Sequence, residues 1–170
     1  IINDGTRSNE ERLGSIGDIY FALEKEKVDE DFLVINSDNL FSFDLLKIYE
    51  YFKLREAPII SIYDVGSLEI AKRMGNPKID EDNKIIFFKE KDENIKSSLC
   101  SIGIYFFTRE AIGLIKEYLG EGNSSDRSGD FIEWLYKKRD IYGHVFDSDE
   151  DKWFDIGSLE SYEKAKRVWG

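Results

Sequence analysis

The clearest strand signal in the chain is a run of four apolar residues, Phe32 to Ile35. The run is followed by Asn36-Ser37-Asp38-Asn39. Such a run is typical of a strand buried on both faces of a parallel sheet, and ligands bind just outside the carboxyl ends of such strands. The pattern therefore predicts that Asp38 lies at a binding crevice. An ordinary strand-to-helix turn, in which Asp38 or Asn39 binds backbone amides, explains the same residues about as well.

Helical spacing and extended apolar runs alternate along the rest of the chain. Apolar positions three and four residues apart predict helices over 15–23, 44–54, 67–73, 110–119 and 131–138, and a last helix from about residue 158. Apolar runs predict strands over 59–63, 99–107 and 141–146, a hairpin over 78–80 and 84–89, and a short strand from 153 that leads into a turn. This alternation indicates an α/β sandwich around a mixed, mostly parallel sheet.

Four stretches predict features other than regular helices and strands. Residues 74–77, Met-Gly-Asn-Pro, predict a sharp break, and the polar, glycine- and serine-rich residues 121–129 predict a mobile loop. Gly103 interrupts a long apolar strand and predicts close approach of another backbone or a ligand. Residues 1–3 read as the tail of a strand. From that tail we expect further sequence upstream.

Composition narrows the classes of function. A chain of 170 residues, 41% hydrophobic and 14% aromatic, is most simply one packed domain spanning residues 1–170. Its formal charge of -11 disfavours nucleic acid as a partner, although a local cation or metal can still bind a small anion. No apolar stretch approaches membrane-spanning length, so we expect no membrane partner and a cytoplasmic protein.

Metal chemistry is restricted by the single cysteine, Cys100, and the single histidine, His144. Any metal should therefore be a hard cation held by carboxylates. Asp38 and Asp155 both end apolar strands, and Mg²⁺ commonly uses one or two protein carboxylates together with substrate phosphates. A helix-entry or turn carboxylate is an equally good explanation of Asp155 taken alone.

Several motifs in order resemble those of the sugar-phosphate nucleotidyltransferases, and the nearest type is the glucose-1-phosphate thymidylyl- and uridylyltransferases. The resemblance covers nearly the whole chain, and its most specific part is the last motif. The motifs are Leu13-Gly14-Ser15-Ile16-Gly17, Ser37-Asp38-Asn39, Phe88-Lys89-Glu90-Lys91, Ile102-Gly103-Ile104-Tyr105-Phe106 and Trp153-Phe154-Asp155-Ile156-Gly157-Ser158.

The resemblance implies a Rossmann-like fold, a nucleoside triphosphate (dTTP or UTP) and a sugar 1-phosphate as partners, and Mg²⁺ as cofactor. It implies that Asp38 and Asp155 hold the metal and that Lys91 is the catalytic residue facing the sugar phosphate. A homo-oligomer is compatible with it. The implied substrate-binding residues are Gly14 beside the base, with Asn39, Gly75, Glu90, Gly103 and Trp153.

The chain departs from the family pattern in three places. The first strand and its glycine-rich loop, which wraps the triphosphate, are absent from residues 1–170. Asp92 stands where proline is usual, and residues 74–77 differ from the family's sugar-side turn. Two further hypotheses follow: a non-catalytic relative that binds a nucleotide sugar, and a glycosyltransferase that uses a nucleotide sugar and a metal-binding aspartate.

Overall fold

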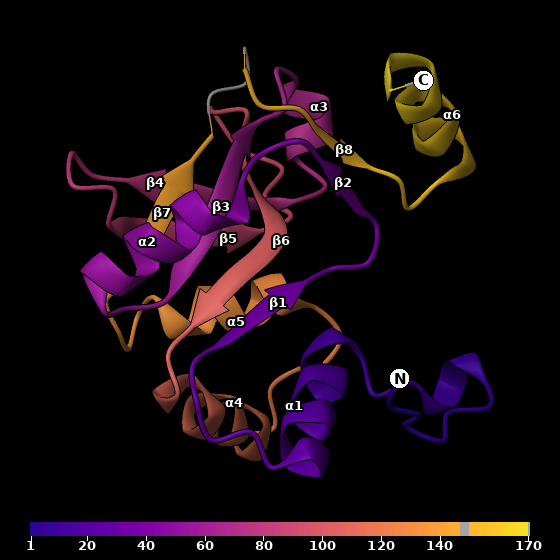
Figure 1. Ribbon diagram of the computed structural model, residues 1–170, viewed down its shortest axis with the longest axis vertical. Helices are drawn as coiled ribbons and strands as arrows, with labels where there is room; N and C mark the ends of the chain where they lie inside the picture. The colour runs from indigo at the N-terminus through magenta and orange to yellow at the C-terminus, as the bar shows by residue number, and fades with distance from the viewer. Residues whose placement is uncertain (147–149, 170) are drawn as a thin grey trace.

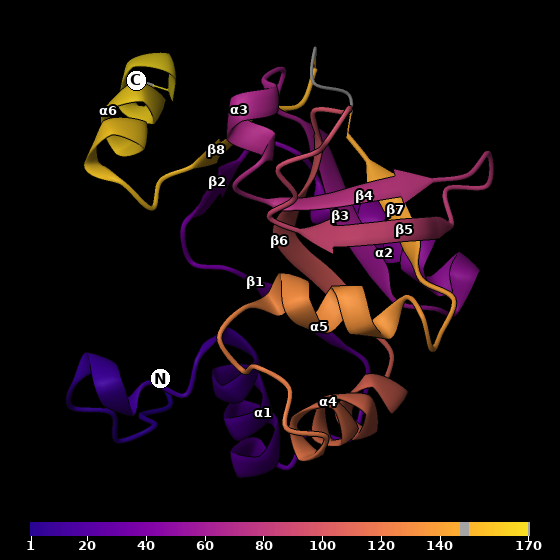
Figure 2. The same cartoon turned by 180° about the vertical axis from the view of Figure 1, so that it is seen from behind.

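A six-stranded mixed sheet forms the centre of the molecule, and the computed structural model describes residues 1–146 and 150–169 (Figures 1 and 2). The strand order is β5-β4-β6-β3-β7, and β1 also pairs with β6. A separate pair, β2 and β8, lies beside the sheet. The strands are β1 (Phe32–Ile35), β2 (Asn39–Phe41), β3 (Ile59–Asp64), β4 (Gly75–Ile79), β5 (Ile85–Glu90), β6 (Leu99–Phe107), β7 (Tyr142–Val145) and β8 (Trp153–Asp155).

Helices cover both faces of this sheet, which confirms the predicted α/β class (Figures 1 and 2). Helix α2 packs on one face over a core that includes Ile48, Phe52 and Phe106. Helices α1, α4 and α5 pack on the other over a larger core that includes Phe107 and Phe131. The helices are a 3-10 turn η1 (Asn9–Glu11), α1 (Ser15–Glu26), α2 (Leu45–Arg55), α3 (Leu68–Ala71), α4 (Glu110–Gly120), α5 (Ser128–Leu135) and α6 (Leu159–Trp169).

The pairing within the sheet corrects the prediction that it is mostly parallel. Among the described strands only β3 and β7 form a parallel pair, and the other ladders between them are antiparallel. The reason is the position of β6, which lies between β1 and β3 and runs against both. Strands β1, β3, β4 and β7 consequently point the same way even though they seldom pair with one another.

Strand β6 changes partner along one of its edges, and this change positions the site. Its second half pairs with β1, whereas Ser101 in its first half pairs with Gly75 of β4. Gly103 lies between the two regions with a φ of +72°, in the left-handed region that favours glycine. The opposite edge follows β3 with a register shift between Ile60 and Ile62. Strands β1 and β4 therefore diverge around Gly103.

Strand β1 is not buried on both faces. Leu33 and Ile35 are each 40% exposed, while Phe32 and Val34 pack on the core. This alternation is typical of a strand covered on one face only. Among the described residues β1 pairs with β6 alone, and an apolar run in the sequence does not reveal which edge of a strand has a partner.

Three further predictions about the backbone are wrong. Residues 1–3 form no strand. Residues 75–79 form β4 rather than a sharp break; β4 meets β6 only at Gly75 and is an edge strand beyond it, where Pro77 is tolerated. Helix α5 begins at Ser128, three residues before the predicted start. The acidic stretch over residues 147–152 predicts a loop, and residues 147–149 of it lie outside the described residues.

Helix α6 stands apart from the main body of the molecule and follows directly from β8 (Figure 1). Within residues 1–146 and 150–169, no helix has both the length and the apolar character needed to cross a membrane.

Candidate active site

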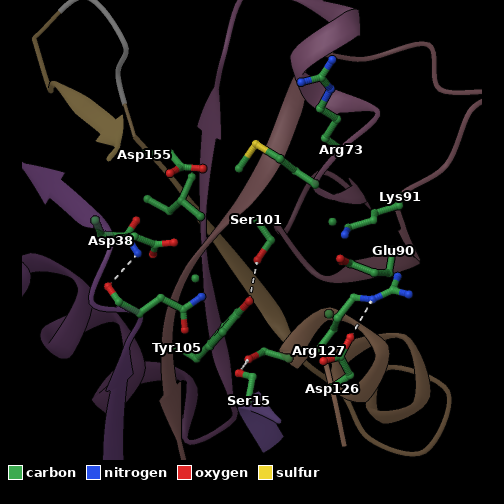
Figure 3. A pocket seen from close by; sticks show the side chains of 18 of the residues that line it. Ser15, Asp38, Arg73, Glu90, Lys91, Ser101, Tyr105, Asp126, Arg127 and Asp155 are labelled. Carbon is green, nitrogen blue, oxygen red and sulfur yellow. Dashed lines mark hydrogen bonds and ion pairs between the residues drawn. The ribbon is translucent and has the colours of Figure 1, made fainter. Parts of the chain in front are cut away.

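A cleft of about 380 Å³ opens where β1 and β4 diverge along β6 (Figure 3). Every residue predicted to belong to the site lines this cleft except Gly14. Gly14 lines an adjoining hollow of about 430 Å³, which shares Ser15, Asn36, Asp38 and Asp126 with the cleft. The predicted residues that line the cleft are Asp38, Asn39, Gly75, Glu90, Lys91, Gly103, Trp153 and Asp155.

Asp38 and Asp155 are brought together by the small β2–β8 sheet. Asn39 is the antiparallel partner of Asp155, and the Ile156 N–H donates to the Asp38 carbonyl at 2.8 Å. A Cβ built on Gly157 would lie 3.0 Å from Asp155 Oδ1 and 3.2 Å from Asp38 Oδ2. The two carboxylates, distant in sequence, thus approach the same point in space.

Asp38 and Asp155 suit a hard divalent cation that takes only part of its ligands from the protein. The described residues contain no group of three or more His, Cys, Asp or Glu side chains arranged to hold a metal. Mg²⁺ is typically held by one or two carboxylates, with phosphate and water oxygens completing its shell. The oxygen donors of Asp38 and Asp155 at the edge of a cleft fit that requirement.

Trp153 helps to hold the strands that position Asp38 and Asp155. Its indole Nε1–H donates to Asn39 Oδ1 at 2.5 Å, and its ring packs 5.8 Å from that of Tyr63. A side-chain bond therefore reinforces the β2–β8 ladder next to Asp38 and Asp155. The structure places Trp153 and Asn39 together, as neighbouring members of one wall of the cleft.

Glu90 and Lys91 lie at the end of β5, on the side of the cleft opposite Asp38 and Asp155 (Figure 3). Lys91 has a φ of +52°, and its N–H donates to the Met74 carbonyl at 3.0 Å. This strained left-handed residue turns the chain immediately after β5. As a result, successive residues both line the cleft.

The Glu90 side chain is enclosed by backbone from two elements. A Cβ on Gly75 would lie 3.1 Å from Glu90 Oε2, and a Cβ on Gly129 would overlap the same oxygen. Burial raises the pKa of the Glu90 carboxyl to about 7, and repulsion from Asp130 adds to the increase, while Lys91 counteracts it. Glu90 can therefore exchange a proton near neutral pH.

Gly103 is closely approached, but the group nearest to it is the Asn36 side chain rather than the backbone or ligand that the sequence predicts. A Cβ at this position would lie 2.5 Å from Asn36 Nδ2. The Asn36 N–H also donates to the Gly103 carbonyl at 2.9 Å. Gly103 thus allows the end of β1, and with it the Asp38 turn, to lie against β6.

Sequence reasoning missed the wall of the cleft that residues 126–129 form, directly after Ser125. This segment was predicted to be part of a mobile loop, yet hydrogen bonds attach it to the start of α1: Ser15 N–H to Asp126 O at 3.1 Å, Ile16 N–H to Ser125 O at 2.9 Å and Ser125 Oγ to Leu13 O at 2.6 Å. Gly14 has a φ of +81°, and a Cβ there would lie 2.5 Å from the Ser125 carbonyl oxygen. The predicted role of Gly14 beside a base stays a prediction; its observed contact is this segment.

Arg127 also lines the cleft, although the sequence did not single it out. It adds a positive charge to that of Lys91 and lies on the Glu90 side of the cleft (Figure 3). Arg127 pairs with Asp126 at 3.7 Å and Asp130 at 3.8 Å. Its only sequence signal was a basic residue within a glycine- and serine-rich stretch. The remaining missed residues are Ser15, Asn36, Arg73, Met74, Ser101, Ile102, Tyr105, Asp126, Ser128 and Gly129.

The chain is similar in sequence to proteins named glucose-1-phosphate adenylyltransferase. The glucose-1-phosphate adenylyltransferase of Fervidobacterium nodosum is 34% identical over 140 residues, which are 78% of this chain and 32% of that protein. The enzyme of the same name from Lachnospira eligens is 30% identical over 165 residues, which are 94% of this chain and 38% of that protein. The chain thus spans about a third of the length of these curated relatives.

Solved structures share the fold. A protein from Bacillus anthracis described as a glucose-1-phosphate thymidylyltransferase, solved in complex with a sucrose, matches with a TM-score of 0.78. The two are 24% identical, and the match covers 93% of this chain and 62% of the other. The expected nucleotide-diphospho-sugar transferase type of fold is confirmed. Because the profile of the nucleotidyl transferase family also matches residues 4–168, the chain belongs to that family.

Proposed function

We propose that the protein transfers a nucleotidyl group from a nucleoside triphosphate to a sugar 1-phosphate and releases pyrophosphate. The observation that carries this proposal is the convergence of Asp38 and Asp155 beside Gly157, in a cleft whose other side carries Glu90 and Lys91. One side then suits a phosphate-bound cation, and the other suits a polar, anionic second substrate.

In the proposed reaction, a phosphate oxygen of the sugar 1-phosphate attacks the α-phosphorus in line and pyrophosphate departs. Such a reaction requires chiefly that two anions be aligned and their charge neutralised. Lys91 would face the sugar phosphate, and an ionised Glu90 would accept hydrogen bonds from sugar hydroxyl groups. Asp38 and Asp155 would hold Mg²⁺, which when bound neutralises charge on the phosphate oxygens.

We propose glucose 1-phosphate as the sugar substrate, because the matched relatives carry that substrate in their names. For the base, the thymidylyl or uridylyl preference predicted from the sequence stays a prediction. The sequence relatives are adenylyltransferases, so ATP belongs in the same test as UTP and dTTP.

The test is to incubate the intact protein and Mg²⁺ with glucose 1-phosphate and each triphosphate, and to measure pyrophosphate and the nucleotide sugar by mass spectrometry. We expect both products in equal amounts with one base preferred. Transfer of sugar from a nucleotide sugar without pyrophosphate would instead identify a glycosyltransferase. Calorimetric binding of nucleotide sugar with no turnover would favour the non-catalytic hypothesis.

A further inference from the structure

One face of helix α5 packs on the end of β5 beside the cleft. Gly129 and Glu133 are four residues apart, so they lie one turn apart on the same side of the helix. Both contact the residues that end β5. Two residues of α5 that were not predicted to bind substrate therefore lie against Glu90 and its neighbour Lys89.

Gly129 contacts the side chain of Glu90. A Cβ at position 129 would lie 2.5 Å from Glu90 Cδ and 3.2 Å from Cγ, and would overlap Oε2. Such distances are too short for a real side chain, so the carboxyl would have to move. The carboxyl is the mobile end of a long side chain. A methyl group at position 129 should therefore displace Glu90 while the helix stays in place.

Glu133 contacts the backbone of the same residue. Its Oε2 accepts the Glu90 N–H at 3.2 Å, and its Oε1 accepts from Lys89 Nζ at 2.9 Å. The Glu133 side chain is 21% exposed. It thus anchors the last residue of β5 from the backbone side, while Gly129 leaves room for the side chain.

We propose that Gly129 and Glu133 are positioning residues that direct the Glu90 carboxyl into the cleft and so determine affinity for the sugar. This inference rests on the proposed function. It adds to that function two residues that position Glu90 without being predicted sugar contacts. Neither residue needs to touch substrate. Their effect passes through Glu90 alone.

The pKa of the Glu90 carboxyl reports where that carboxyl lies, because charged groups surround it. Asp130 and Glu133 face it from α5, Arg127 from the segment before α5, and Lys91 from the end of β5. From β6, Tyr105 is affected by the Glu90 charge. Burial, with Asp130 and Glu133, raises the pKa of Glu90, so a displaced carboxyl that reaches solvent should titrate at a lower pH.

The first test compares Gly129→Ala with Gly113→Ala. Both glycines are in helices, but a Cβ at Gly113 has nothing within 4 Å. We expect Gly129→Ala to weaken glucose 1-phosphate binding, measured by calorimetry, about tenfold or more, since a hydrogen bond to a charged group is lost. Gly113→Ala should bind as the wild type does, and both variants should melt cooperatively.

The second test separates the hydrogen bond of Glu133 from its ion pair with Lys89. Glu133→Ala removes both, whereas Glu133→Gln keeps an oxygen that can accept the Glu90 N–H. We expect Glu133→Ala to weaken glucose 1-phosphate binding about tenfold and Glu133→Gln to restore most of the affinity. The matched control is Glu117→Ala on α4, which removes a 2.7 Å ion pair with Lys138.

A ¹³C carboxyl titration of the unliganded protein accompanies these measurements. The Glu90 midpoint should fall from about 7 in Gly129→Ala, which removes no charge, and should not change in the two controls. If the wild type binds glucose 1-phosphate and both Gly129→Ala and Glu133→Ala bind it with the same affinity, the positioning role is overturned. If the wild type itself fails to bind glucose 1-phosphate, the proposed function fails instead, and the titration still reports whether α5 holds Glu90.

Discussion

At the scale of single residues, Glu90 couples proton binding to folding. Its pKa is raised from an ordinary 4.5 to about 7 in the folded chain, mainly by burial. The folded state therefore binds a proton more tightly than the unfolded state. Its favourable contribution is complete below about pH 4.5 and is lost as the pH rises through about 7.

We predict that Glu90→Gln removes this dependence. The free energy of unfolding of the wild type, relative to that of Glu90→Gln, should decrease by roughly 2 kcal/mol between pH 5 and pH 8, after allowance for solvent screening. Urea denaturation at several pH values measures the difference. An increase in relative wild-type stability over this range would show that the sign is wrong.

Gly103 offers a second prediction at this scale, with Gly66 as its matched control. Both have positive φ, +72° and +65°, but a Cβ on Gly66 meets nothing within 4 Å, whereas one on Gly103 would lie 2.5 Å from Asn36 Nδ2. Gly66→Ala should cost about 1 kcal/mol for backbone strain alone. Gly103→Ala should cost at least about 1 kcal/mol more because β1 must shift.

Thermal and urea denaturation of both variants give that difference directly. Equal destabilisation would mean that the contact between Gly103 and Asn36 has no energetic weight. The same comparison applies to activity, since only Gly103→Ala should displace the end of β1 and the following turn that carries Asp38.

At the scale of elements, the start of α1 is joined to the start of α5. The hydroxyl groups of Ser15 and Ser128 are 2.5 Å apart, and Ser128 is buried. A double-mutant cycle with Ser15→Ala and Ser128→Ala should give a coupling of about 1 kcal/mol in the free energy of unfolding. A coupling near zero would show that the two helices are held by the backbone bonds of residues 125–126 alone.

Local patterns predicted most helices and strands, because their signals lie within a few residues. Helix α2 and strand β3 agree closely with their predicted ranges. The second half of β4 was predicted as one arm of the hairpin over 78–80 and 84–89, but its first half, residues 75–77, was missed, since Gly75 and Pro77 together have turn chemistry and only pairing with β5 makes them a strand. The antiparallel direction of the β4–β5 ladder follows from the predicted hairpin, whereas the directions of the ladders that β6 forms with β1 and β3 escaped prediction because they depend on where β6 is inserted.

At the scale of the whole molecule, the site depends on contacts that no local pattern contains. Asp38 and Asp155 were predicted as a pair from strand ends and family resemblance, and the β2–β8 ladder shows how they meet. Residues 126–129 could not be predicted as a wall of the cleft. Their position follows from hydrogen bonds to the start of α1, more than a hundred residues earlier in the chain.

The central claim is that Asp38 and Asp155 act together on one phosphate-bound cation. We therefore propose to measure Mg²⁺-dependent pyrophosphate release in Asp38→Asn, Asp155→Asn and the double variant, with the exposed Asp140→Asn as control. Each single variant should lose about a hundredfold or more in kcat, and the double variant should lose little further, since one shared function can be removed only once. Wild-type turnover in either single variant would contradict the account, as would losses that multiply in the double variant.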